Sequence, residues 1–128
     1  MATWAGRLKD ARNFLEVAEA VNDQEHGNQA ASNAILAAIA ANDAICLFLI
    51  QQQPSGTSHT EAVRLLEEAC RGTRWEEEAA RKVRQLADLI HQKNAAQYRG
   101  EALSPQVVAR IMLQAERFIE WAAQIVQG

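Results

Sequence analysis

The feature that most constrains this sequence is an apolar stretch in its first half that carries almost no charge. From Asn33 to Ile50 the chain contains no Lys, Arg or Glu, and its apolar residues fall on all sides of a helical projection. A helix that is apolar all round has to be buried on nearly all sides. We therefore expect a central helix over about residues 28–52, ended by the Pro-Ser-Gly sequence that begins at Pro54.

Such a helix is difficult to cover completely in a chain of 128 residues. We expect part of it to stay exposed, including small residues that allow another helix to approach closely: Ala37, Ala38, Ala40 and Ala41. An exposed apolar face of this kind suits a second subunit, so the sequence predicts a homodimer. Because Asn42 and Asp43 interrupt the apolar run, we expect it to be too short to cross a membrane.

Four further segments show the spacing of three and four residues that is typical of amphipathic helices. They cover about residues 3–22, 58–70, 75–98 and 104–126. Ser58 and Glu61 have the spacing of a capping box, which would open the third of the five helices. We expect Gly72 to end that helix. Thr73 and Glu76 repeat the capping-box spacing before the fourth. Short loops join the segments, so we expect one all-α domain over residues 1–128, an up-and-down bundle of four or five helices.

Charge and cysteine content argue against several classes of function. The formal net charge is −3 and the pI is about 5.6, which does not suit a general nucleic-acid binder. Arg81, Lys82 and Arg84 could form a local basic patch or simply a solvated helix face. Cys46 and Cys70 lie in or beside apolar runs, which favours structural thiols over a disulfide or metal site. With no cofactor motif and no signal peptide in view, we expect a cytoplasmic protein without cofactor or metal.

Polar residues interrupt two of the expected apolar faces. The apolar stripe of the fourth helix continues into Asn94, Gln97 and Tyr98. Asn42 and Asp43 interrupt the central helix. A buried polar group without a partner costs about 1–3 kcal/mol, so each of these side chains needs a hydrogen bond if it is buried. They could serve structure alone, by capping a loop or fixing helix register, or they could line a polar groove.

These segments also resemble the HEPN-domain family. Residues 32–45 (SNAILAAIAANDAI) resemble the family's second helix, in which an Asn and an Ala precede a segment of small residues. His59 with Glu61 is similar to the segment that opens the third helix. Residues 93–98 (KNAAQY) resemble the Arg-x-x-Ala-Asp-Tyr block of one HEPN branch, and residues 104–126 resemble the closing helix.

HEPN domains are up-and-down helical bundles that are usually dimeric, and many are metal-independent ribonucleases or toxins paired with a small nucleotidyltransferase antitoxin. The resemblance implies a prokaryotic protein that dimerises through its second and fourth helices. It also implies a partner protein, RNA or nucleotide as the ligand. The site would be a composite polar groove formed where two fourth helices meet, lined by Asn42, Asp43, Lys93, Asn94, Gln97 and Tyr98.

Active HEPN members use an Arg followed, four to six residues later, by a His. The His can transfer a proton near neutral pH while the Arg stabilises negative charge on phosphate. Where the family's His is expected, this chain has Ala96 or Gln97, and neither can transfer a proton. One match to the spacing remains, because six residues separate Arg84 from His91 on one edge of the fourth helix. That pair is either catalytic or part of a solvated helix face.

Three functions are compatible with these observations. The first is a HEPN-like dimer that has lost ribonuclease activity and binds a partner protein, such as a nucleotidyltransferase in a toxin–antitoxin or defence module, or a nucleotide or RNA. The second is an active metal-independent ribonuclease toxin that uses Arg84 and His91, assisted by Asn94 and Tyr98. The third is a general protein-interaction bundle whose likeness to HEPN is only shared helical patterning.

Overall fold

The computed structural model describes residues 2–23, 25–55, 59–98 and 102–127, with the side chains of all of these except 59 and 94–98. Within that part of the chain there are five helices and no strand. They are α1 (Trp4–Ala20), α2 (Gly27–Ile50), α3 (His59–Cys70), α4 (Glu76–Tyr98) and α5 (Pro105–Gln127). The all-α prediction is confirmed, and the helix ends lie within a few residues of those expected.

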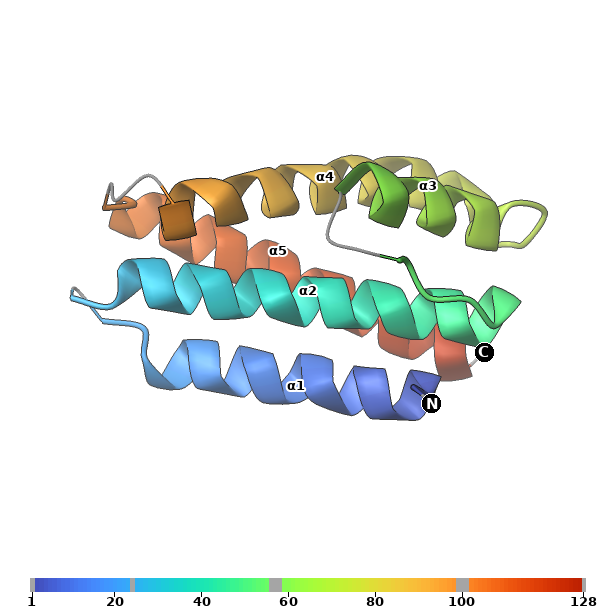
Figure 1. Cartoon of the computed structure of the whole chain (residues 1–128), viewed down its shortest axis with the longest axis horizontal. Coiled ribbons are helices and arrows are strands. Elements are labelled where there is room, and N and C mark those ends of the chain that lie inside the picture. Colours follow the sequence, from blue (N-terminus) through green and yellow to red (C-terminus); the bar gives the residue numbers. More distant parts are fainter. Residues whose placement is uncertain (1, 24, 56–58, 99–101, 128) are drawn as a thin grey trace.

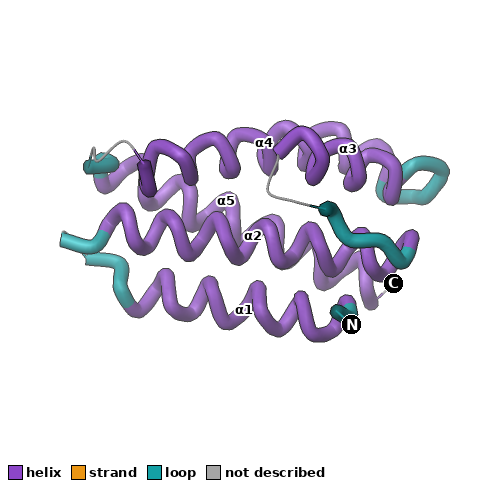
Figure 2. The backbone as a smooth tube through the Cα atoms, viewed as in Figure 1, coloured by secondary structure: helices purple, strands orange, loops and turns teal. Residues whose placement is uncertain are grey.

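The helices pack around α2, which lies at the centre of the bundle (Figure 1). α1 packs along one side of α2 and α5 along another, while α3 and α4 form an antiparallel hairpin over the remaining side. α4 has 23 residues and α3 only 12, so α3 covers the half of α4 nearest the hairpin turn (Figure 2). Both chain ends lie at the same end of the bundle as that turn.

α2 is enclosed by its own chain. Thirteen of its 24 residues are buried, and Ala37, Ala38, Ala40 and Ala41 have no exposed surface. The expectation that these four alanines would stay open to a second subunit is therefore wrong. The physical reason is that small side chains let the neighbouring helices approach closely, so that four helices suffice to enclose a fifth.

α2 is also the one helix of the described segments that is long and apolar enough to cross a membrane. The expectation that it would be too short is wrong as to length, because the helix continues without a break through Asn42 and Asp43. More than half of its most apolar window is buried inside the bundle, and Asp43 pairs with Arg7 of α1. Both features are those of a core helix in a helical bundle.

The predicted caps of the α3–α4 hairpin are formed only in part. Gly72, expected at the end of α3, has a φ of 78°, the left-handed conformation that favours glycine after a helix. The hydroxyl of Thr73 accepts a hydrogen bond from the N–H of Trp75 at 3.1 Å, not from that of Glu76. Glu76 accepts from the N–H of Gly72 at 3.3 Å, because α4 begins later than the sequence suggests. The other predicted box involves Ser58, which lies outside the described residues.

Cys46 and Cys70 are free and fully buried, which confirms the prediction of structural thiols. Burial raises the pKa of the Cys70 thiol to about 11 and also raises that of Cys46. At pH 8 we therefore expect the folded protein to react with Ellman's reagent about 100-fold more slowly than the protein unfolded in guanidinium chloride. The unfolded protein should titrate both thiols at once, and a fast-reacting thiol in the folded protein would contradict the expectation.

Candidate functional site between α3 and α4

Asn42, one of the two polar residues in the middle of α2, joins this helix to α3. Its side chain is buried, and its Nδ2 donates a hydrogen bond to the carbonyl oxygen of Ala62 at 3.3 Å. The Cys46 thiol lies 4.0 Å from its Oδ1 and donates to it. Both ends of the amide are therefore engaged inside the protein, and Asn42 fixes the position of α3 on α2.

Asp43 faces a different neighbour, α1. Its Oδ2 accepts hydrogen bonds from Nε and Nη2 of Arg7 at 3.1 and 2.9 Å, and Gln53 donates to the same oxygen at 3.4 Å. Arg7 also binds Asp10 at 2.7 Å. Burial raises the pKa of the Asp43 carboxyl, and the hydrogen bonds and charge of Arg7 act against that shift. No local sequence pattern indicates this ion pair, because Arg7 lies 36 positions away from Asp43.

The polar block at the end of α4 lies far from both of these residues. α4 ends at the end of the bundle where α2 begins (Figure 1). There the side-chain oxygen of Asn28 accepts a hydrogen bond from the N–H of Leu103 at 2.9 Å. Asn42 lies 14 positions further along α2, about 21 Å at 1.5 Å per residue. Within one molecule, the predicted composite groove is therefore not assembled from Asn42, Asp43 and the end of α4.

The remaining members of that predicted groove are on the last turns of α4. The helix continues through this block to Tyr98, and the side chain of Lys93 is partly exposed. The side chains of Asn94, Gln97 and Tyr98 lie outside the described residues. Their role in a groove stays a prediction.

A groove follows the line where α3 and α4 pack together. Two cavities of about 360 and 340 Å³ follow one another along it, and both are lined by Glu67. Small apolar side chains form the floor, and charged side chains stand along the walls. The cavity nearer the hairpin turn is lined by Glu67, Arg71, Glu76, Ala79, Ala80, Val83 and Arg84. The second is lined by Thr60, Val63, Arg64, Glu67 and Ala87.

Arg84, predicted as half of a catalytic pair, stands on the α4 wall of this groove. Its side chain is exposed, and so is that of His91. His91 follows seven positions later, or about 10 Å along the helix axis. In the described part of the chain no hydrogen bond or ion pair orients either side chain. The structure thus places both side chains on the surface of α4. Neither is held in a fixed orientation by a hydrogen bond, as the groups of an acid–base catalytic pair usually are.

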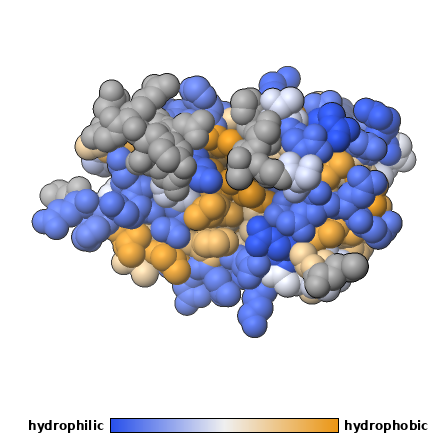
Figure 3. Space-filling model, viewed as in Figure 1, coloured by the Kyte–Doolittle hydropathy of each residue, from blue (hydrophilic) through white to orange (hydrophobic). Residues whose placement is uncertain are grey.

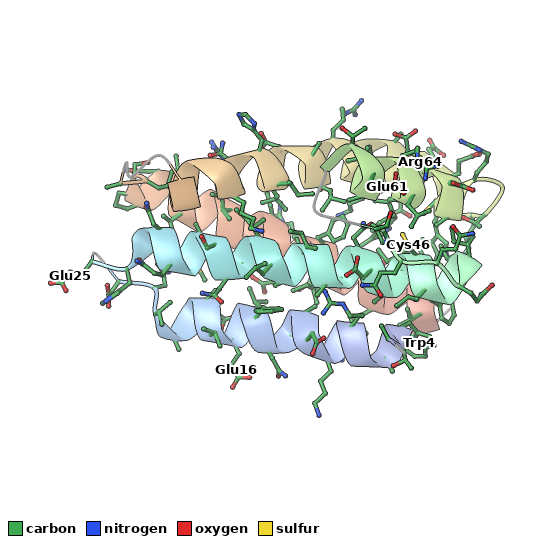
Figure 4. The ribbon with its side chains drawn as sticks, viewed as in Figure 1. Trp4, Glu16, Glu25, Cys46, Glu61 and Arg64 are labelled. Carbon is green, nitrogen blue, oxygen red and sulfur yellow. The ribbon has the colours of Figure 1, made fainter. Side chains whose placement is uncertain are left out.

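The charges along the groove are only partly balanced. Arg64 forms ion pairs with Glu61 at 2.9 Å and with Glu68 at 3.1 Å, and Figure 4 shows Glu61 and Arg64 side by side on α3. By contrast, Arg71 and Arg84 have no ion pair within the described segments. They stand on opposite walls of the cavity near the turn, where their guanidinium groups can bind carboxylates from another molecule.

Of the two alternatives for Arg81, Lys82 and Arg84, a shared basic patch or a solvated helix face, the structure forms neither with all three residues, because Lys82 is buried. Lys82 is 9% exposed and lies against α5, with its Nζ 5.7 Å from the centre of the Trp121 ring. Burial lowers the pKa of the Lys82 amine, and the charges of Arg81 and Arg117 act in the same direction. Arg84 instead lines the groove beside α3. A cluster of three neighbouring cations for phosphate binding is therefore not formed.

The groove residues Glu67, Arg71 and Ala80 were missed by sequence reasoning. Their signal was weak but present: a short hairpin loop follows α3, and small residues recur along the neighbouring face of α4 at positions 79, 80 and 87.

No protein-family model matches this chain, and no curated protein matches it either. Among the described side chains, no three His, Cys, Asp or Glu residues are placed to hold a metal ion.

Proposed function

We propose that this chain is a HEPN-like helical bundle that acts by binding a partner protein through the groove between α3 and α4, without cleaving RNA. The groove supports this function most directly. It combines an apolar floor with a charged rim, the usual anatomy of a protein-binding surface. The order of the helices and residues 32–45 of α2 support the HEPN-like part. A small nucleotidyltransferase is the partner class that this resemblance suggests.

The exposure of Arg84 and His91 favours binding over catalysis. Acid–base catalysis of RNA cleavage needs a histidine held within hydrogen-bond reach of the attacking or leaving oxygen. His91 is exposed on α4 and has no orienting partner among the described residues. At the position where the resemblance places a histidine, the chain has Ala96 or Gln97.

We include a homodimer in the same proposal, with fewer residues of α2 in the interface between the subunits than the sequence suggests. The alanines of α2 are buried, but Leu36 and Ile39 of the same helix are partly exposed. An apolar area is also visible between hydrophilic regions on the face of the molecule that carries α2 (Figure 3). A second subunit would cover such an area.

RNA cleavage separates this function from the ribonuclease alternative. We expect the purified protein to leave a fluorescein-labelled RNA of mixed sequence intact in the presence of EDTA, at the background rate of the buffer. The variants His91→Ala and Arg84→Ala should give the same result as the wild type. Cleavage by the wild type that falls about 100-fold or more in His91→Ala would contradict the proposal and establish the ribonuclease alternative.

A further inference from the structure

We propose that the groove between α3 and α4 binds an amphipathic helix of about three turns, with small or branched apolar residues on its buried face and acidic residues along its flanks. This inference rests on the proposed function and identifies the kind of segment that the partner presents. It follows from the length of the groove, the size of its floor residues and the charges on its walls.

The dimensions of the groove suit a helix. It follows residues 76–87 of α4, about 16 Å at 1.5 Å per residue, which is three turns of a docked helix. Small floor side chains such as Ala79, Ala80 and Ala87 allow a second helix axis to come close. An extended segment would find no strand edge here to pair its backbone groups, whereas a helix satisfies its own.

The unbalanced charges favour acidic flanks. Arg71 and Arg84 stand on opposite walls without an ion pair in the described part of the chain. Glu76 already accepts the N–H of Gly72, which leaves Glu67 as the remaining carboxylate of that cavity. A helix with carboxylates on both flanks would reach both guanidinium groups, each through charge-assisted hydrogen bonds.

The same residues argue against RNA as the occupant. A phosphate backbone along the groove would pass Glu67 and Glu76, which repel it. No aromatic side chain is among those that line either cavity, so unpaired bases have no ring on which to stack. The net charge of −3 adds to the repulsion.

Two synthetic peptides of 14 residues test the proposal by fluorescence anisotropy. Both carry Ala and Leu at helical positions i, i+3, i+4 and i+7, with Glu on the flanks of one and Lys on the flanks of the other. We expect the acidic peptide to bind at least tenfold more tightly than the basic one. Arg71→Glu and Arg84→Glu should each weaken binding of the acidic peptide at least tenfold. The matched control is Arg12→Glu, the same charge reversal on the exposed surface of α1, which should leave the affinity unchanged.

Circular dichroism establishes that each variant is folded before it is compared. Equal affinity for the two peptides, no binding of the acidic peptide, or binding that survives both arginine reversals would overturn the proposal. So would a 20-nucleotide RNA that displaces the acidic peptide. The peptide results leave the proposed function standing with another kind of partner segment. RNA that occupies the groove, or RNA cleavage that depends on His91, removes the proposed function itself.

Discussion

Replacing Arg7 with alanine is expected to lower the free energy of unfolding by about 3 kcal/mol at pH 7. The change leaves the carboxylate of Asp43, whose side chain is 8% exposed, without the guanidinium that donates two hydrogen bonds to it. Removing one partner of a buried ion pair costs more than the pair contributes, because the remaining charge stays in a poorly solvating place. Urea unfolding followed by circular dichroism measures the loss.

The loss should depend on pH in a defined direction. Burial raises the pKa of Asp43 above its ordinary 3.8 and Arg7 opposes that shift, so the pKa rises further when Arg7 is removed. A carboxyl whose folded-state pKa is above its unfolded value holds its proton more firmly in the folded state. The free energy of unfolding then falls as pH rises from the unfolded-state pKa to the folded-state pKa. The difference between wild type and variant should therefore be smallest near pH 4 and grow toward pH 7.

Two further variants separate this effect from a general change in α1. Arg12→Ala removes an exposed arginine from the same helix and should change stability by no more than about 0.5 kcal/mol. The double variant Arg7→Ala/Asp43→Ala should lose the added pH dependence, because the unpaired carboxyl is gone. If Arg7→Ala changes the free energy of unfolding at pH 7 no more than Arg12→Ala does, the ion pair between Arg7 and Asp43 does not stabilise the fold as its geometry indicates.

The helices could be predicted from the sequence because their signals are local. Apolar spacing, together with Gly72 and the Pro-Ser-Gly sequence after α2, placed all five helices in the right order. The absence of Lys, Arg and Glu from 33–50 correctly indicated a buried helix. Which segments cover that helix is decided by tertiary packing, because it depends on how closely the four other helices approach it. The spacing of apolar residues along the chain does not determine the distance between helices.

The site was harder to predict because it depends on side-chain direction and on packing between helices. Asn42 and Asp43 were expected to share a groove, but successive residues on a helix point about 100° apart. They therefore face α3 and α1 respectively. Arg84 was singled out for its spacing to His91. Its neighbours in the cavity include residues of α3 and of the turn that follows it, and the periodicity of α4 does not predict which residues of another helix lie beside it.

Filling the space around α2 is expected to be nearly as damaging as the loss of Arg7. Ala41 has no exposed surface, so Ala41→Leu forces three additional carbon atoms into a closely packed core and should cost about 2–3 kcal/mol of unfolding free energy. Helix propensity cannot account for such a loss, because alanine and leucine differ little on that scale. Ala109→Leu is the matched control on an exposed position of α5, and it should be close to neutral.

The dependence of this loss on protein concentration tells whether α2 is covered within one chain or by a second subunit. If the other helices of the same chain enclose Ala41, the substitution destabilises the folded monomer, and the loss is the same at two concentrations 50-fold apart. If a second subunit covers Ala41, the substitution weakens association, so the loss appears at the high concentration and disappears on dilution. A loss that disappears on dilution would contradict the packing of α2 within one chain. It would favour a dimer in which the alanines of α2 form the interface, because Ala41 would then be exposed in the isolated chain and buried only in the dimer.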